Sequence, residues 1–246
     1  MNAPLDPAAR QQLLARAARC YRNAGQEQDA CRCLESAGDY SAAGLMHEQA
    51  ARWSEAATCF EQAGQWPLAA RCFLAAEQPQ EAARCYLAAD NLLEAAWVLA
   101  HYAHRFDAAR IALANFKPQE PEQVLAQMLA MARCAVPAKN GEAGRLLRQV
   151  YLRLNELHEG AGRNRIINWA FALADEAMDR PDLVLELMAT AWNSDIDTRN
   201  QWERWAKRRL GSTEVIALLE QAKETNTADA TPMAGKANTN QENTPS

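Results

Sequence analysis

Aromatic residues make up only 7% of this 246-residue chain, and no segment alternates β-branched or aromatic residues with polar ones over several positions. Such alternation is the usual pattern of a half-buried strand, so its absence argues against a β-sandwich or a β-barrel. Alanine is abundant instead, and it favours helices that pack at short distances. With 49% hydrophobic residues, the composition predicts an all-α protein with a substantial core.

Charge of one sign and long apolar runs are also missing. The net charge is −5 and the two signs are mixed along the chain, so no basic patch for nucleic acid or an anionic membrane is evident. No stretch approaches the ~18 uninterrupted apolar residues of a membrane span, and MNAPLDPAARQQ (1–12) lacks the pattern of a signal peptide. We therefore expect a cytoplasmic protein without membrane contact, whose seven cysteines stay reduced.

The nucleotide-binding and hydrolase strings are absent too: G-x-G-x-x-G, G-x-x-x-x-G-K-[ST], G-x-S-x-G and H-E-x-x-H do not occur. The neighbouring acids Asp175 and Glu176 face different directions on a helix and do not form an acid/base pair by spacing alone. We therefore expect no enzymatic activity, no cofactor and no small-molecule substrate.

A thirteen-residue period runs through the first half of the chain. When the sequence is divided every thirteen residues from Ala17, the segments align without a gap. The segments are AARCYRNAGQEQD, ACRCLESAGDYSA, AGLMHEQAARWSE, AATCFEQAGQWPL, AARCFLAAEQPQE, AARCYLAADNLLE, AAWVLAHYAHRFD and AARIALANFKPQE. Position one is always alanine, position two is small, and position four is Cys, Met, Val or Ile. Repeats of this kind are typical of stacked architectures.

Each segment predicts a helix of nine or ten residues followed by a turn of three or four. Positions one, four, five and eight lie on one side of an α-helix and form one apolar stripe. Position nine is Gly25, Gly38 or Gly64 in three segments, and glycine favours the left-handed conformation just beyond a helix end. Position twelve carries residues that suit the next helix start, as N-cap hydroxyls or a first-turn proline: Ser41, Ser54 and Pro67.

Helices this short are marginal in water when isolated, so each must pack against its neighbours. The tight turns make successive helices antiparallel, and the small residues at positions one and two let their backbones approach closely. Two segments, or 26 residues, form one hairpin. The sequence therefore predicts a stack of short helical hairpins, an α-solenoid.

Segments such as AATCFEQAGQWPLAARCF (56–73) resemble the A-x-x-[aromatic]-x-x-A-G-x-[aromatic]-x-x-A-A phrasing of the tetratricopeptide-like α-solenoid superfamily. The resemblance covers about residues 8–116 and is greatest to short-helix branches such as SNAP-type adaptors and the solenoid arms of coat and transport complexes. The repeat is shorter than the tetratricopeptide repeat of about 34 residues, so no peptide-binding residues are transferred. The resemblance implies a non-catalytic scaffold that holds protein partners.

The strict period ends at FKPQEPEQ (116–123), and longer amphipathic patterns follow. They predict helices at about 121–135, 142–159, 164–178, 181–192, 197–210 and 213–223. We therefore divide the chain into short-helix solenoid repeats (1–117), a C-terminal helical region that continues or caps them (118–222), and a tail (223–246). The tail has one large apolar residue, Met233, and is predicted to be disordered.

Cysteines recur at position four, which predicts a structural role. They are Cys20, Cys33, Cys59, Cys72 and Cys85. Sister segments place Met46, Val98 and Ile111 at this position, and a metal ligand would not be exchanged with such residues. We therefore expect buried packing residues and no metal site. His101 and His104 are three residues apart on a predicted helix, but no further ligand lies near them, and we interpret them as packing or surface residues.

Two patterns are candidates for partner binding. Tyr40, Trp53 and Trp66 occupy position eleven, where they either form an aromatic ladder for a bound peptide or, as the repeat itself favours, cover the end of the preceding hairpin. Arginine recurs at position three, and Arg19 and Arg71 have no acidic residue three positions earlier, so they could engage an acidic partner. The other position-three arginines have such a neighbour, in the pairs Asp29–Arg32, Glu81–Arg84 and Asp107–Arg110.

The expected function is a protein–protein interaction scaffold or adaptor, an accessory subunit of a larger assembly, because stacked hairpins create extended binding surfaces. Two alternatives stay open. RWAKRR (204–209) interleaves Trp205 with basic residues, a pattern that can bind single-stranded nucleic acid, which would make the chain a nucleic-acid-binding helical repeat protein. The cysteines and histidines leave a metal or thiol enzyme as the other alternative.

Overall fold

The computed structural model describes residues 6–191 and 196–217, and within these ranges every regular element is helical. The all-α prediction is therefore confirmed. The chain divides into two compact units, Met1–Val184 and Leu185–Ser246. The sequence-derived boundary at 117/118 lies inside the first unit, and the tail predicted at 223–246 lies outside the described residues. No described helix is long and apolar enough to cross a membrane.

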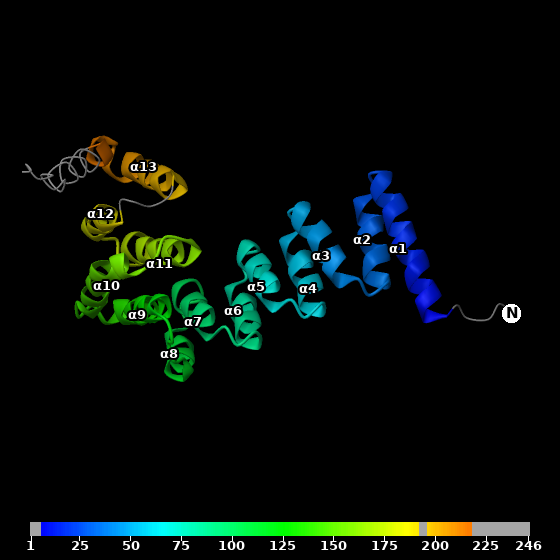
Figure 1. The fold of residues 1–246 in the computed structure, drawn as a ribbon, viewed down its shortest axis with the longest axis horizontal. Helices are drawn as coiled ribbons and strands as arrows, with labels where there is room; N and C mark the ends of the chain where they lie inside the picture. Colours follow the sequence, from blue (N-terminus) through cyan, green and yellow to red (C-terminus); the bar gives the residue numbers. More distant parts are fainter. Residues whose placement is uncertain (1–5, 192–195, 218–246) are drawn as a thin grey trace, which may run out of the picture. The chain divides into compact units, whose positions relative to one another are not determined.

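Short helices form the first part of unit one, and each packs against the next along the chain (Figure 1). The bounds are α1 Pro7–Asn23, α2 Glu27–Ser36, α3 Tyr40–Gln49, α4 Trp53–Gln62, α5 Trp66–Ala75, α6 Pro79–Ala88, α7 Leu92–His101 and α8 Phe106–Asn115. From α2 onward every one of these helices has ten residues, and most turns between them have three. The predicted stack of short helical hairpins is confirmed.

The turn at position nine is left-handed throughout the regular part of the array. Its positive φ values belong to Gly25, Gly38, Ala51, Gly64, Glu77 and Asp90. Glycine was predicted to take this conformation, and three non-glycine residues take it as well, at φ of 54° to 58°. The backbone N–H three residues beyond each of these helix ends then donates to the helix, as Gln65 does to the Phe60 carbonyl at 2.8 Å. This bond satisfies carbonyls that the short helix leaves unpaired.

The core is built from the alanines that open each segment. Position one is fully buried from the second segment to the seventh, at Ala30, Ala43, Ala56, Ala69, Ala82 and Ala95. Aromatic rings at position five contribute to this core, and Phe60 and Phe73 belong to its central cluster. A Cβ added to Gly44 would lie 2.8 Å from the Phe60 ring, so the small residue at position two is required for this packing.

Position-four cysteines were predicted to be buried, and Cys59, Cys72 and Cys85 are. Cys33 is half-buried, and Cys20 of α1 is exposed, so the prediction is wrong for Cys20. The prediction that Ser41 and Ser54 are N-caps is wrong. Each is the second residue of its helix and hydrogen-bonds to a glutamine 24 residues later, as Ser41 does to the Gln65 Oε1 at 3.3 Å.

The period slips by one residue between α7 and α8, where the turn has four residues. The residue with positive φ in this turn is His104, whereas the thirteen-residue period would place it at Ala103. Consequently Ala109 takes the buried place of position one, and Ile111, predicted as a core residue, is 65% exposed. The ungapped repeat of the sequence therefore overestimated the regularity of its last segment.

Longer helices complete the described chain. They are α9 Pro121–Ala135, α10 Glu142–Arg153, α11 Ala161–Ala172, α12 Pro181–Thr190 and α13 Ile196–Leu210. Short 3-10 segments follow α9 and α10 at Val136–Ala138 and Leu154–Glu156, and a π-helical segment follows α11 at Leu173–Ala177. The helix predicted at 121–135 has the observed bounds, and the others differ from their predicted ends by a few residues. The helix predicted at 213–223 extends beyond the described residues.

Candidate functional site

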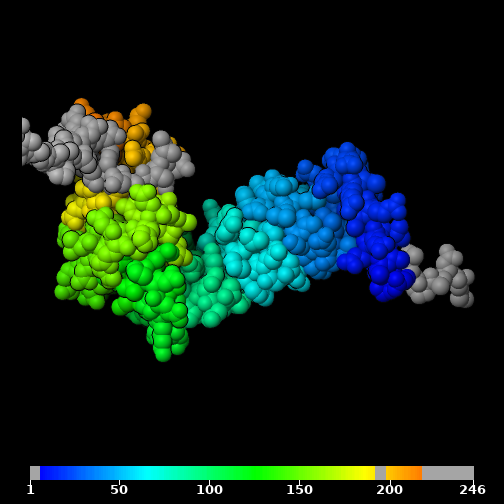
Figure 2. Space-filling model, in the orientation of Figure 1, coloured from blue at the N-terminus to red at the C-terminus, as the bar shows by residue number. Residues whose placement is uncertain are grey.

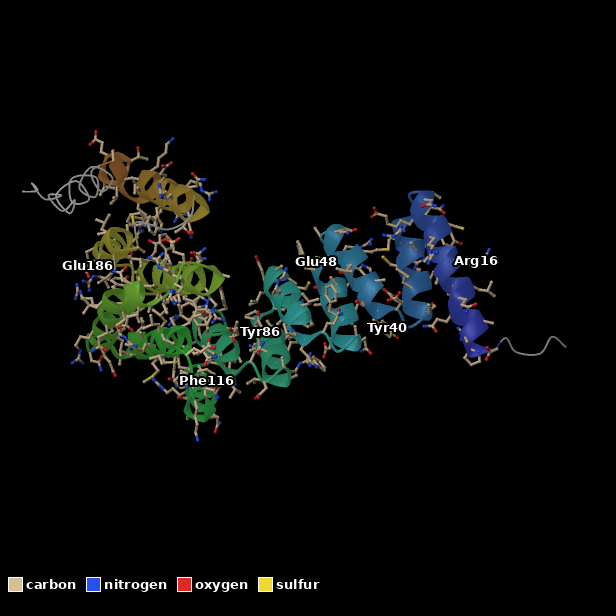
Figure 3. The ribbon with its side chains drawn as sticks, viewed as in Figure 1. Arg16, Tyr40, Glu48, Tyr86, Phe116 and Glu186 are labelled. Carbon is tan, nitrogen blue, oxygen red and sulfur yellow. The ribbon has the colours of Figure 1, made fainter. Side chains whose placement is uncertain are left out.

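Ion pairs between successive hairpins follow the repeat. Arg71 of α5 lies 3.5 Å from Glu48 of α3, and Arg84 of α6 donates a 2.6 Å hydrogen bond to Glu61 of α4. Both pairs join position three of one segment to position six of the segment two before it. A helix is therefore linked to the helix of the same layer in the preceding hairpin, and Glu48 lies on the edge of α3 that receives this link (Figure 3).

The sequence assigned these arginines differently. Arg71 is not free for an acidic partner, because Glu48 pairs with it. Arg84 was predicted to pair with Glu81 of its own helix but pairs with Glu61 instead. The two other predicted pairs within helices are present, at 3.4 Å for Arg32 with Asp29 and 3.1 Å for Arg110 with Asp107.

The first seam, between the α1–α2 hairpin and the α3–α4 hairpin, lacks both ion pairs (Figure 2 shows these hairpins in dark and lighter blue). In α1, Arg22 occupies position six, where α3 has Glu48. In α3, Leu45 occupies position three, where α5 has Arg71. In α2, Glu35 occupies position six, but α4 has Thr58 at position three in place of an arginine. The Thr58 hydroxyl donates to the Ser54 carbonyl at 2.9 Å. The seam between the α3–α4 and α5–α6 hairpins carries both pairs, whereas the next seam has Leu74 and Leu87 in place of the glutamates. The first seam differs from both, because it keeps a carboxylate, Glu35, without its arginine.

On the α1 side the seam opens into a groove of about 320 Å³. Arg19 and Arg22 lie on its rim, both are exposed, and neither makes an ion pair with any residue of the described ranges. Leu45, 48% exposed, is part of the floor. The apolar lining consists of Ala15, Ala18, Leu34, Ala42, Leu45 and Met46. Asp39 and Gln49 complete the lining. The surface therefore combines exposed apolar area with one carboxylate and two guanidinium groups that make no ion pair within the described part of the chain.

On the α2 side the seam holds a cluster of Glu35, His47 and Cys59. The Nε2 atom of His47 is 3.0 Å from Oε1 of Glu35, and the Cys59 thiol donates to the same oxygen at 3.7 Å. The three ligand-type atoms lie within 4.8 Å of one another. The His47 side chain is only 9% exposed, and its Nδ1 atom has no hydrogen-bond partner among the described residues.

Burial raises the pKa of the Cys59 thiol to about 12, with a further contribution from the negative charge of Glu35. The thiol therefore stays protonated at neutral pH when only protein groups surround it. Cys31, a second buried thiol, accepts a 3.6 Å hydrogen bond from Nη2 of Arg52, and burial raises its pKa as well. Neither cysteine is activated as a nucleophile by its surroundings.

A surface hollow of about 480 Å³ opens onto this cluster and is lined by Glu35, Cys59, Tyr40 and Glu55, among others. Tyr40 is the first residue of α3 (Figure 3). Trp53 and Trp66 begin α4 and α5 and pack, half-buried, against the central hydrophobic cluster. The two tryptophans thus cover the core at helix starts, whereas Tyr40 borders the polar hollow.

His101 and His104 do not lie on one helix as predicted, because α7 ends at His101 and His104 adopts a left-handed conformation. Nε2 of His101 lies 3.1 Å from a Glu176 oxygen, and its ring stacks on Trp97 at 4.8 Å. Nδ1 of His104 accepts a hydrogen bond from Arg133 at 3.1 Å. The two rings therefore have separate partners and cannot share a metal ion in this arrangement.

Around His101 the structure has a packed network between α7, α9 and α11. Trp97 stacks on Trp169 at a centroid distance of 4.5 Å and an angle of 4°. Arg165 lies over Trp169 and pairs with both Glu94 and Glu122. Such a network of stacked rings and paired charges fixes the point where the short repeats meet the longer helices.

The basic cluster at 204–209 lies in α13. Trp205 is 2% exposed, so its ring offers no stacking surface to a nucleic-acid base. Arg204 and Lys207 are exposed.

Comparison with protein-family models, curated proteins and solved structures finds no match.

Sequence reasoning missed the Glu35, His47 and Cys59 cluster because its members come from three helices. A signal was nevertheless present in the repeat. Among the first seven segments, position five is Tyr, Leu or Phe in six, and His47 in the third segment is the exception. Thr58 likewise replaces the arginine that would have paired with Glu35. Comparing columns of the repeat, rather than motifs along the chain, identifies both departures.

Proposed function

We propose that this protein is a non-catalytic scaffold that binds a protein partner through the groove between α1 and α3. The observation that carries the proposal is the first seam, where Arg22 and Leu45 replace the glutamate and arginine that link the next two hairpins. Without an ion pair between α1 and α3, apolar surface lies next to the guanidinium groups of Arg19 and Arg22, which make no ion pair with any described residue. Exposed apolar area with a charged rim is typical of protein interaction sites.

The chemistry of the groove defines the partner segment. An apolar side chain would cover Leu45 and the alanines of the floor, and a carboxylate would pair with Arg19 or Arg22. The stacked hairpins support this role, because helical repeats present extended surfaces that their own folding does not require. The resemblance to tetratricopeptide-like adaptors points to the same class of function.

The experiment is affinity capture from the native cells, with the full chain as bait. We expect wild type to retain a partner in stoichiometric amount and R19E/R22E to retain at least about tenfold less, because reversing two rim charges opposes an acidic segment. Arg16→Glu is the matched control, since Arg16 is an exposed residue of α1 outside the groove lining (Figure 3). Recovery of the bait alone as a monomer, or equal retention by R19E/R22E, would overturn the proposal.

A further inference from the structure

The most unusual feature left unexplained by partner binding is the carboxylate of Glu35. Its sister residues Glu48 and Glu61 each pair with an arginine two segments later. Glu35 has Thr58 at that place, and its Oε1 atom instead contacts an imidazole nitrogen and a thiol. The Glu35 side chain is 39% exposed, so the exchange leaves a half-buried carboxylate beside two other groups of metal-ligand type, and this set indicates a positively charged occupant other than arginine.

We propose that Glu35, His47 and Cys59 form a binding site for a divalent transition-metal ion of the zinc type. Imidazole, thiolate and carboxylate are the ligands that zinc prefers, and three of them from different helices already converge. The inference is independent of the groove on the other side of the seam.

Ligand separations agree with this assignment. Zinc bound tetrahedrally at its usual bond lengths places its nitrogen and oxygen ligands about 3.4 Å apart, and its sulfur and oxygen ligands about 3.6 Å apart. The corresponding distances are 3.0 Å from His47 Nε2 to Glu35 Oε1 and 3.7 Å from Cys59 Sγ to the same oxygen. The ligand atoms of His47 and Cys59 lie within 4.8 Å of each other, so this third pair would close by up to about 1.2 Å to reach the ~3.6 Å of tetrahedral zinc.

The charges also balance. On binding, the Cys59 thiol releases its proton to solvent, and the resulting thiolate together with the Glu35 carboxylate offsets both charges of the ion. The hollow beside Tyr40 and Glu55 gives solvent access to the fourth coordination position.

The site would connect elements that the repeat leaves unlinked. Glu35 lies in α2, His47 in α3 and Cys59 in α4, so one ion would join the first hairpin to the second across the seam that lacks both Arg–Glu pairs. Metal binding by the native state alone stabilises that state, and the ion would raise the midpoint of thermal unfolding.

The test is calorimetric titration of the chelator-treated, reduced full chain with Zn²⁺ alone, followed by Co²⁺ spectroscopy. We expect one ion per chain, a thiolate-to-cobalt charge-transfer band, and a higher unfolding midpoint with Zn²⁺. Cys59→Ala should weaken binding at least about tenfold and remove the band, whereas Cys72→Ala, a buried cysteine at the same repeat position, should retain both.

His47→Phe gives a second variant that keeps the fold, because sister helices carry Phe60 and Phe73 at that position. It should fold, as judged by circular dichroism, and bind Zn²⁺ at least about tenfold more weakly. Absence of saturable one-to-one binding by wild type would overturn the proposal. Equal affinity of Cys59→Ala and Cys72→Ala, or unchanged affinity of folded His47→Phe, would do the same.

Discussion

Arg84 of α6 donates a 2.6 Å hydrogen bond to Glu61 of α4, a residue 23 positions earlier in the chain. The hydrogen bond to Glu61 raises the pKa of the Arg84 guanidinium above its already high value. The same relationship joins Arg71 to Glu48, also 23 positions apart, so it belongs to the repeat rather than to one helix. At the first seam Glu35 keeps the place of these glutamates but has Thr58 in place of the arginine.

Arg84 and Glu61 should make a small joint contribution to the free energy of unfolding. In a double-mutant cycle with Arg84→Ala and Glu61→Ala, we expect a coupling free energy of about 0.5 kcal/mol that decreases in high salt, because the pair is partly exposed. Urea unfolding of the four proteins measures it. A cycle on Asp29 and Arg32 provides the comparison within one helix, and no coupling at Arg84 would show that the pair is incidental.

Restoring the missing arginine should compete with the metal. Thr58→Arg places a guanidinium where the sister arginines reach their glutamates, so it should pair with Glu35 and weaken Zn²⁺ binding at least about tenfold. Thr58→Ala is the control and should bind like wild type, because the Thr58 hydroxyl is occupied by the Ser54 carbonyl. Competition with a coloured chelator gives the affinities, and equal values for both variants would contradict the expectation.

The left-handed turns carry strain that glycine would relieve. Glu77 has φ of 58°, so Glu77→Gly should increase the free energy of unfolding by about 1 kcal/mol. Gly64→Ala at the same repeat position should lower it by a similar amount, since no atom lies within 4 Å of the added Cβ and only the backbone conformation matters. Thermal and urea unfolding measure both. Effects of the same sign would refute the role of backbone strain.

The slipped register between α7 and α8 makes opposite predictions for two neighbouring residues. Ile111, which is 65% exposed, should tolerate Ile111→Ala with a change in unfolding free energy within about 0.5 kcal/mol. Leu113, which is 6% exposed, should lose about 2 to 4 kcal/mol in Leu113→Ala. If Ile111→Ala is the costlier variant in urea unfolding, the ungapped thirteen-residue register is correct instead.

Burial makes stability depend on the charge of His101. Burial lowers the pKa of His101 below its ordinary value, an effect that the hydrogen bond and charge of Glu176 oppose only in part. Below about pH 6.5 the unfolded chain takes up a proton that the native ring resists, so the native state loses stability as the pH falls toward the lowered pKa of folded His101. Above pH 6.5 this loss is absent.

Urea unfolding between pH 5 and pH 7.5 should therefore show a steeper decrease for wild type than for His101→Gln, which cannot take up the proton. The difference between the two curves isolates His101 from the other titrating groups. The unfolding free energy of wild type minus that of His101→Gln should decrease toward low pH. If this difference stays constant or increases toward low pH, the direction assigned to the His101 pKa is wrong.

The sequence by itself determined the helices, the turns and the class of fold. Thirteen-residue spacing of alanine, apolar residues at one helical face and glycine at Gly25, Gly38 and Gly64 act over a few neighbouring residues, and such local preferences can be read along the chain. They also located the junction after residue 115, because proline at 118 and 121 interrupts the pattern.

Only the tertiary structure decided which polar groups meet. Arg84 has an acid three residues earlier in its own helix, yet it pairs with Glu61 because hairpin packing brings α4 and α6 into one layer. Glu35, His47 and Cys59 are spaced by twelve residues, and their distances depend on how three helices pack, a relationship that no motif along the chain encodes. The period predicted the array, and the packing of side chains between hairpins created the site.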